Sequence, residues 1–255
     1  MPAFRSLKKP PLSMEVERQL KLSILNRKYN AGQKLPSERE LVDQFQVSRV
    51  TVREVLRGLQ QSGLVQIKRG REAGAYVCEP DSTAITDNFQ NLIQMGKVNF
   101  SHLIEIRLYT EPDVARSAAL HRSPEDIDTL VQLLDKAETY SNTSRKKARL
   151  MNVQFHCEVA KILDNAMIIF LCESITQVYS ANIIEMTHTK LDKKGIGKLI
   201  LEHREILDSI VARKPDEAFE RTKKHLIETY YTYTRIIPDS YDEDVDKRIR
   251  YFAGL

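Results

Sequence analysis

The sequence contains only three cysteines and no long apolar segment. No stretch approaches the roughly 18 apolar residues that a membrane-spanning helix needs. The first residues lack the apolar segment of a secretory signal. Cys78, Cys157 and Cys172 are an odd set without paired spacing. We therefore expect a cytoplasmic protein with reduced thiols, and neither a disulfide framework nor a cysteine-based zinc site.

Several enzyme signatures are also missing. The chain has no H-E-x-x-H motif, no glycine-rich phosphate loop and no recognisable Ser/His/Asp set. His156-Cys157-Glu158 imitates the start of a zinc deaminase motif, but the P-C-x-x-C that would complete it does not follow. These absences disfavour one alternative function, a metal-dependent hydrolase with an accessory nucleic-acid-binding domain.

The charges are distributed unevenly along the 255 residues. The chain is 42% hydrophobic and 29% charged, with a net charge of +4, which is ordinary for a globular protein. Residues 1–80 carry 15 Lys+Arg against 8 Asp+Glu, whereas residues 81–255 carry 24 against 27. Turn-forming residues near position 80 mark a break. We predict two domains, 1–80 and 81–255, of which the basic first one binds a polyanion.

The pattern of the first domain predicts a winged helix-turn-helix. Ser13 can cap a first helix, and Ser37-Glu38-Arg39-Glu40 forms a capping box that starts a short second helix. Ser48 caps a third helix over 49–62. Extended segments around a basic, glycine-containing tip then follow up to residue 77 and predict a β-hairpin. Two short helices joined by a tight turn are typical of DNA-binding proteins.

The third helix has two different faces. Its inward face is apolar, whereas Arg49, Arg53 and Arg57 recur every four residues on the outward face. Arginine forks can bind guanine edges or phosphates, and a helix N-terminus attracts phosphate. Surface arginines on an ordinary solvated helix are the alternative, but the capping box, the turn, the arginines and the basic hairpin together favour DNA binding.

Residues 30–78 closely resemble the signature of the GntR family of bacterial transcription regulators. The match runs through Gly32-Gln33-Lys34-Leu35-Pro36-Ser37-Glu38-Arg39-Glu40-Leu41, Val47-Ser48-Arg49-Val50-Thr51-Val52-Arg53 and Gly74-Ala75-Tyr76-Val77. Ala73 stands where many relatives have a second glycine. The resemblance implies that Arg39, Arg49 and Arg53 contact DNA and that Ser48 and Thr51 fix the recognition helix. It also implies that Arg69 and Gly70 enter the minor groove.

The second domain is predicted to be an all-α antiparallel bundle, which makes the chain mostly α. The periodicity indicates six or seven helices near 84–96, 100–120, 124–140, 145–163, 166–189, 196–213 and 215–236. Gly195 and Gly197 are interpreted as a break between two helices. The charge-blocked tail after Pro238 is expected to be a frayed end, with a short helix against a partner subunit as the alternative.

Three histidines on separate helices suggest a metal site. Asn152 and His156 are four residues apart and share a helix face, and His203 and His225 lie on later helices. Imidazoles that converge in a helical bundle can bind a transition metal, although helical histidines more often have no such role. We assign no function to the remaining histidines, which are His102, His121 and His188.

The helical part resembles the FCD ligand-sensing domain of the FadR subfamily of GntR regulators. The resemblance rests on Glu105-Ile106-Arg107, Glu111-Pro112, Asn152-Val153-Gln154-Phe155-His156 and Asn165, with the two later histidines. It implies a divalent metal bound by Asn152, His156, His203 and His225, with Arg107 facing the cavity. Zinc is the leading candidate, and nickel or manganese fit the same ligand types. Three imidazoles and an amide leave the ion its full charge, so we expect a small carboxylate effector that bridges the metal and Arg107.

The predicted function is therefore a ligand-responsive transcription regulator. As a homodimer it would place two recognition helices about one DNA turn, or roughly 34–36 Å, apart on a palindromic operator. The effector would bias the placement of the two DNA-binding domains. Release of a repressor is the commoner pattern in similar proteins.

Overall fold

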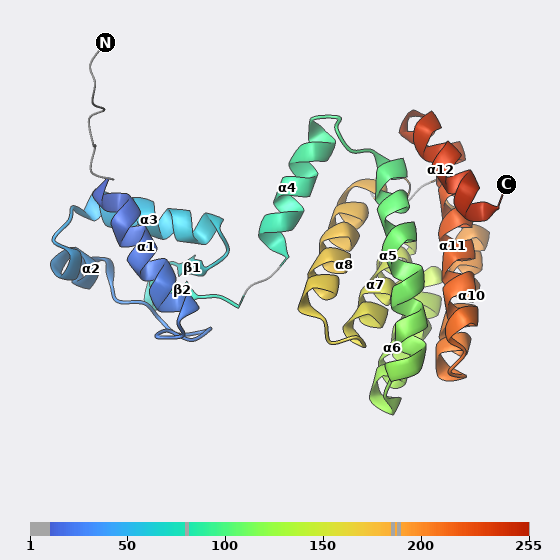
Figure 1. Ribbon diagram of the computed structural model, residues 1–255, viewed down its shortest axis with the longest axis horizontal. Coiled ribbons are helices and arrows are strands. Elements are labelled where there is room, and N and C mark those ends of the chain that lie inside the picture. The colour runs from blue at the N-terminus through green and yellow to red at the C-terminus, as the bar shows by residue number, and fades with distance from the viewer. Residues whose placement is uncertain (1–10, 80–81, 185–186, 188–189, 255) are drawn as a thin grey trace, which may run out of the picture. The chain divides into compact units, whose positions relative to one another are not determined.

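The computed structural model describes residues 11–79, 82–184, 187 and 190–254. The chain forms two compact units, Met1–Ala84 and Ile85–Leu255, and each is helical in the main (Figure 1). The mostly α fold class predicted from the sequence is confirmed. None of the helices in the described residues has the length and apolar character needed to cross a membrane.

The first unit is a winged helix-turn-helix. It consists of α1 (Leu12–Leu25), α2 (Glu38–Phe45), α3 (Arg49–Gln61), β1 (Val65–Lys68), the 3₁₀ turn η1 (Gly70–Glu72) and β2 (Gly74–Val77). Ser37 and Glu40 form the expected capping box, and Ser48 accepts a hydrogen bond from the Thr51 N–H. The prediction for Ser13 is wrong, because α1 begins at Leu12 after Pro11, without a side-chain cap.

The wing, residues 65–77, is a two-stranded antiparallel hairpin. Val65 pairs with Val77 and Lys68 with Gly74. Its tip needs Gly70, which has a φ of 80°, a left-handed value that favours glycine. The segment before α2 adds to the hairpin, since the Leu35 N–H donates to the Ala75 carbonyl. The apolar faces of the three helices and the wing close over one core, whose fully buried members include Leu41, Val52 and Leu59.

The second unit is a bundle of antiparallel helices. Its α-helices are α4 (Thr83–Gln94), α5 (Phe100–His121), α6 (Pro124–Ser141), α7 (Arg145–Lys161), α8 (Ala166–Tyr179), α10 (Lys193–Val211), α11 (Pro215–Ile236) and α12 (Glu243–Ala253). The helix α5 packs along α11, and α6 packs against both α7 and α10 (Figure 1). A π-helical turn, η2 (Ser180–Ile184), follows α8, and a 3₁₀ turn, η3 (Pro238–Ser240), follows α11.

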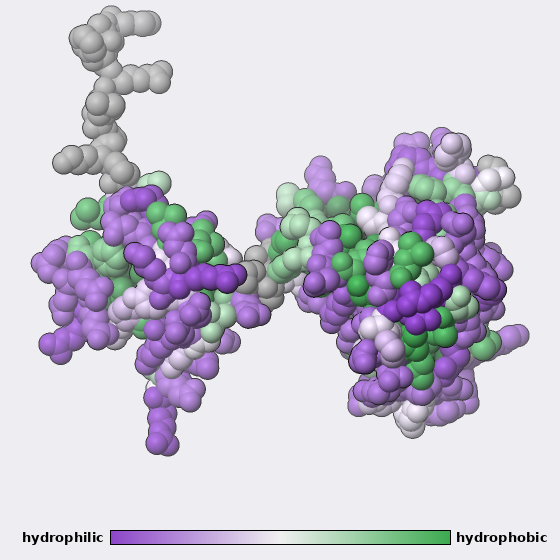
Figure 2. All heavy atoms as spheres, turned by 60° about the horizontal axis from the view of Figure 1, so that its bottom comes forward, coloured by the Kyte–Doolittle hydropathy of each residue, from purple (hydrophilic) through white to green (hydrophobic). Residues whose placement is uncertain are grey.

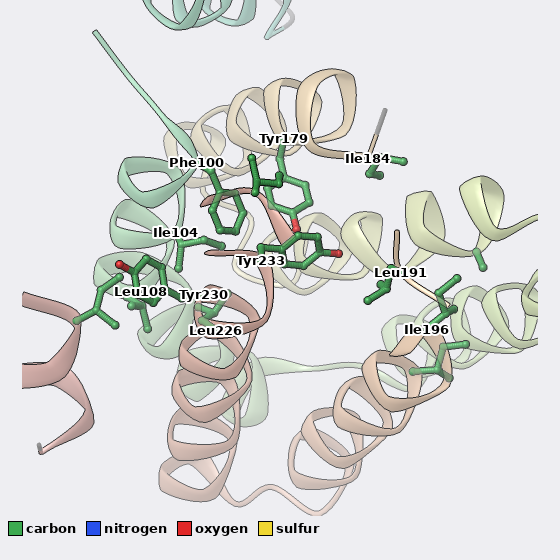
Figure 3. Packing of buried hydrophobic residues seen from close by; sticks show 14 of the residues in the cluster. Phe100, Ile104, Leu108, Tyr179, Ile184, Leu191, Ile196, Leu226, Tyr230 and Tyr233 are labelled. Carbon is green, nitrogen blue, oxygen red and sulfur yellow. The ribbon is translucent and has the colours of Figure 1, made fainter. Parts of the chain in front are cut away.

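Two apolar clusters hold the bundle together. In one, the rings of Phe100, Tyr179 and Tyr233 pack with centroids 5.3–6.3 Å apart (Figure 3). The other contains Phe155, Leu134 and their neighbours on α5, α6, α7 and α10. Hydrophilic residues cover much of the face of this unit seen in Figure 2. Residues of α7 contribute to both clusters, so its buried polar groups lie deep in the bundle.

Three details of the bundle differ from the prediction. Gly195 and Gly197 do not separate two helices. They lie in the first turns of α10, where the Asp192 side chain accepts a hydrogen bond from the Gly195 N–H. The α-helix predicted over 166–189 ends at Tyr179, and the π-helical turn η2 follows it. The tail is not frayed, because α12 is capped by Asp242 and buries Val245 and Ile249.

Candidate functional site: a basic recognition surface and a buried histidine cluster

The outward face of α3 carries exposed arginines. Arg49, Arg53 and Arg57 are all exposed, whereas the opposite face buries Val52, Val55, Leu56 and Leu59 in the core. The Ser48 hydroxyl accepts from the Thr51 N–H at 3.1 Å and lies 2.9 Å from the Thr51 hydroxyl. Ser48 and Thr51 therefore fix the first turn of this helix.

A groove of about 600 Å³ separates α3 from the wing. Its cationic lining residues are Lys34, Arg53, Arg57, Lys68 and Arg69. Arg39 is exposed on α2, and Arg69 and Gly70 are exposed at the tip of the wing. Within the groove the Arg53 Nε donates to the Glu38 carboxylate at 2.8 Å. The residues predicted to contact DNA thus lie on the exposed surface of one small unit.

The three histidines singled out from the sequence converge in the core of the bundle. His156 comes from α7, His203 from α10 and His225 from α11, and each has at most 6% of its surface exposed. One ring nitrogen from each lies within 4.8 Å of the others. The Nε2 atoms of His156 and His203 are 3.0 Å apart.

Each imidazole is held through its other nitrogen. His156 Nδ1 lies 2.8 Å from the Glu111 carboxylate, and His225 Nδ1 lies 2.7 Å from the Glu202 carboxylate. His203 Nδ1 lies 2.8 Å from the Asn152 amide oxygen. These oxygens accept hydrogen bonds from the Nδ1–H groups, and in this tautomer the facing Nε2 atoms of His156 and His203 carry no proton. A metal-binding histidine is commonly oriented by such a partner on its second nitrogen.

Burial keeps the rings of His156 and His203 neutral. It lowers the pKa of His156 to about 4, although the Glu111 carboxylate opposes the shift. Burial also lowers the pKa of His203 well below its ordinary value, and the neighbouring His225 and His156 add to this effect. Burial alone would raise the pKa of Glu111, but Arg107 and then His156 hold it below its usual range. Neutral imidazoles beside an ionised carboxylate are the state that binds a cation.

The donor set fits a transition-metal ion. Two nitrogens bound to one tetrahedral zinc at about 2.0–2.1 Å lie about 3.3 Å apart, close to the His156–His203 separation. Asn152 is the one predicted ligand that faces elsewhere: its oxygen contacts Nδ1 of His203, on the side of the ring away from His156. Its amide nitrogen donates to the Ala148 carbonyl, which fixes the orientation of the amide. In this geometry Asn152 orients His203.

His102 and His121 make other contacts, outside this cluster. His102 takes part in the capping box of α5 with Asn99, and the Nδ1 of His121 lies 2.8 Å from the Ser117 carbonyl. His188 is outside the described residues.

Arg107 lines the same small cavity as the histidines, where sequence reasoning placed it. Its guanidinium is 4% exposed and makes two hydrogen bonds to Glu111, of 2.7 and 3.2 Å. The positive charge of Arg107 is therefore already balanced inside the protein. Through Glu111 it is also linked to His156.

Sequence reasoning missed four side chains around the cavity. Glu111 and Glu202 hold the histidines, while Arg149 and Thr229 line the cavity wall. A signal for Arg149 was present, since positions 149, 152 and 156 share one face of a helix that is otherwise apolar there. No comparable signal marks Thr229, because a threonine is common on buried helix faces.

Comparisons with known proteins agree with these observations. Residues 12–77 match the family described as bacterial regulatory proteins, gntR family, and residues 102–228 match the FCD domain. The HTH-type transcriptional repressor NanR of Escherichia coli K12 is 31% identical over 227 residues, covering 87% of this chain and 84% of the relative. NanR of Shigella flexneri has the same identity and coverage.

A solved structure is also similar. A GntR protein of Streptococcus agalactiae superposes with a TM-score of 0.62 at 25% identity, covering 85% of this chain and 98% of that one. The relatives are transcription regulators, which confirms the prediction of a regulator over that of a hydrolase. The chain belongs to the GntR family of bacterial transcription regulators and combines the family's DNA-binding domain with an FCD domain.

Proposed function

We propose that this protein is a homodimeric repressor whose binding to a palindromic operator is controlled by a small carboxylate at a metal site in its FCD domain. One observation carries the proposal: three buried imidazoles from three helices each bring one ring nitrogen within 4.8 Å of the others, and the Nε2 atoms of His156 and His203 face each other at 3.0 Å. A domain of 1–80 would bind DNA, and a domain of 81–255 would bind the metal and the effector and form the dimer.

The ligands of the metal would be His156, His203 and His225. Asn152, the fourth ligand predicted from the sequence, would join them only after it leaves Nδ1 of His203. Zinc suits imidazole ligands and tetrahedral geometry, while nickel and manganese remain alternatives for the same donors. When bound, the ion supplies a fixed positive charge that attracts an anion into the cavity.

The effector would reach an arginine of the cavity wall with its carboxylate. The sequence predicts Arg107 for this role, and its place in the wall supports that assignment. Its tight pairing with Glu111 argues against it, because the effector would have to displace a buried carboxylate.

On DNA, Arg49 and Arg53 would reach bases or phosphates in the major groove, with Arg39 beside them. Arg69 and Gly70 would enter the minor groove, and Ser48 and Thr51 would fix the reading helix. The exposure of Arg39, Arg49, Arg53, Arg69 and Gly70 supports these roles. The relatives named as repressors support negative control.

Fluorescence anisotropy with labelled DNA from upstream of the protein's own gene tests the proposal. We expect a sequence-specific complex that weakens steeply with salt and that small acids dissociate only when the metal is present. Arg49→Ala should weaken the complex by about ten- to hundredfold, or 1–3 kcal/mol. The matched control is Arg235→Ala, which changes an exposed arginine near the end of α11. Equal responses of metal-loaded and EDTA-treated protein to every acid would reject the role of the metal.

A further inference from the structure

A second cationic group lies in the wall of the histidine cavity. Arg149, on α7, is 1% exposed, so its guanidinium is among the most deeply buried charges of the chain. It donates to the Thr187 hydroxyl at 2.5 Å, to the Tyr233 hydroxyl at 2.7 Å and to the Ile184 carbonyl at 3.4 Å. All three acceptors are neutral. Among the described residues, no carboxylate forms an ion pair with Arg149.

The burial of this charge is only partly compensated. Neutral acceptors satisfy some of its five N–H groups, and the Tyr233 ring lies 5.3 Å from its central carbon. Arg107, in the same wall, differs because Glu111 balances its charge. A buried guanidinium without a counter-ion is costly, and its planar fork is shaped for a carboxylate. Within the described residues no carboxylate balances this guanidinium, and an anion in the cavity would do so.

A second polar group of the same wall also lacks a partner. The Thr229 hydroxyl is buried and, within the described part of the chain, forms no hydrogen bond. Thr229 lies on α11 between His225 and Tyr233, each four residues away, so the three side chains share one helix face. A buried hydroxyl without a partner costs free energy that a ligand oxygen would recover.

These observations define a subsite beside the metal site. Arg149 and Asn152 lie three residues apart on α7, which corresponds to about 4.5 Å along the helix axis. Tyr233 connects the two walls, because its hydroxyl accepts from Arg149 and its ring packs against Tyr179 and Phe100 (Figure 3). The cavity has room for about 20 Å³ of water-sized groups, which is little more than one water molecule. Only a small ligand fits, and side chains of the wall must rotate to admit it.

We propose that Arg149 and Thr229, and not Arg107, form the anion-recognition subsite of this protein. The ligand is a small organic acid whose carboxylate binds the Arg149 guanidinium and accepts from the Thr229 hydroxyl. It carries a second oxygen group, a carboxylate, hydroxyl or carbonyl, for the metal. Arg107 is a positioning residue that holds Glu111 and, through it, His156. The inference rests on the proposed metal site, because the second oxygen group requires it.

Two variants and a matched control test the subsite in the full-length, zinc-loaded protein. Thr229→Val removes the orphan hydroxyl and keeps the shape of the side chain. Thr222→Val does the same to another buried, unpartnered hydroxyl of α11, which does not line the cavity. Arg149→Met removes the charge and keeps the length. Calorimetric titration would use lactate, malate, oxalate, malonate and succinate, with succinamide as the uncharged probe.

We expect at least one of these acids to bind and succinamide not to bind. Thr229→Val should weaken the acid about two- to tenfold and Arg149→Met about ten- to hundredfold, while Thr222→Val leaves the affinity unchanged. Both threonine variants should be at least as thermostable as the parent protein. If Arg149→Met fails to fold, Arg149→Lys and Thr229→Val carry the test, since a lysine keeps the charge but loses the fork.

The outcomes separate the subsite from the metal. One outcome is that Thr229→Val and Arg149→Met bind the acid as the parent protein does, while EDTA treatment still abolishes binding. This outcome would overturn the subsite and leave the metal site in place. Weaker binding in these variants, with no dependence on metal, would retain the subsite and reject the proposed function. Failure of all the acids to bind the parent protein at about 10 mM, a very weak affinity limit, would reject carboxylate recognition altogether.

Discussion

The Nε2 atoms of His156 and His203 face each other at 3.0 Å, although both rings are buried and neutral. Their Nδ1 atoms are held by Glu111 and by the Asn152 oxygen, so the protons lie on the far sides of the rings. Two lone pairs directed at each other repel unless a cation lies between them. This relationship between two residues underlies the proposed metal site.

The same relationship predicts a loss of stability in mild acid for metal-free protein. His156 takes up a proton near pH 6.5 when unfolded but only near pH 4 when folded. Between these values the unfolded state binds more protons, so stability falls as the pH falls. His156 alone contributes a loss on the order of 2 kcal/mol between pH 7 and pH 5.

Urea unfolding of EDTA-treated protein at both pH values measures this loss. His156→Gln should reduce the difference between the two curves, whereas His121→Gln, at an exposed position, should leave it unchanged. A parent protein equally stable at pH 7 and pH 5 would contradict the assigned burial of a neutral His156.

Glu202 is predicted to strengthen metal binding without touching the metal. Its carboxylate holds His225 Nδ1 at 2.7 Å, and loss of such a partner typically weakens metal binding about ten- to hundredfold. Glu202→Gln should therefore raise the dissociation constant for zinc by this factor in a competition titration with a chelator. Glu228→Gln is the control, because Glu228 also pairs with Lys198 but contacts no histidine of the cluster. Equal losses in both variants would assign the effect to Lys198 instead.

Glu38 is predicted to restrain DNA binding. It pairs with Arg53 at 2.8 Å, and both side chains are largely exposed. DNA must compete with this ion pair for the arginine. Exposed pairs of this kind contribute about 0.2–1 kcal/mol, so Glu38→Gln should tighten operator binding by up to about fivefold. Fluorescence anisotropy at two salt concentrations measures this change in operator affinity. The double variant Arg53→Ala/Glu38→Gln tests whether the change requires Arg53. Tighter binding that persists without Arg53 would show general charge repulsion in place of competition.

The three thiols are predicted to differ in reactivity. Burial raises the pKa of Cys157 to about 11 and that of Cys172 to about 12, so neither is a thiolate near neutral pH. Cys78 is only partly buried. At pH 8 a thiol reagent should modify one site rapidly and two further sites only after unfolding. In Cys78→Ser the rapid phase should disappear, and a rapid phase that survives would place a reactive thiol in the bundle.

Much of the fold follows from local signals in the sequence. The capping box at Ser37, the cap at Ser48 and the four-residue spacing of the arginines act over one or two turns, and the structure has them as expected. The histidines were identifiable because they fall on separate helices within a recognisable family pattern. Their convergence needs helix packing, which single-sequence periodicity does not specify.

The errors have physical causes. Gly195 and Gly197 suggested a break because glycine is unfavourable inside a helix, but Asp192 caps that helix and the apolar face that follows is buried. The tail was expected to fray because of its charge blocks, yet Val245 and Ile249, four residues apart, are apolar and buried. Arg149 was overlooked because a lone arginine on a helix is usually exposed, and only the packed bundle reveals its burial.

X-ray absorption spectroscopy of the gently purified full-length protein tests the central claim most directly. The spectrum is recorded at the X-ray absorption edge of the bound metal. For zinc, the account predicts three imidazole ligands with metal–nitrogen distances of about 2.0–2.1 Å, and oxygen ligands that complete the coordination shell. In His203→Ala the metal should be lost or should keep fewer imidazole ligands, whereas His121→Ala should retain all three. A metal bound through sulfur, or three imidazole ligands in His203→Ala, would contradict the account.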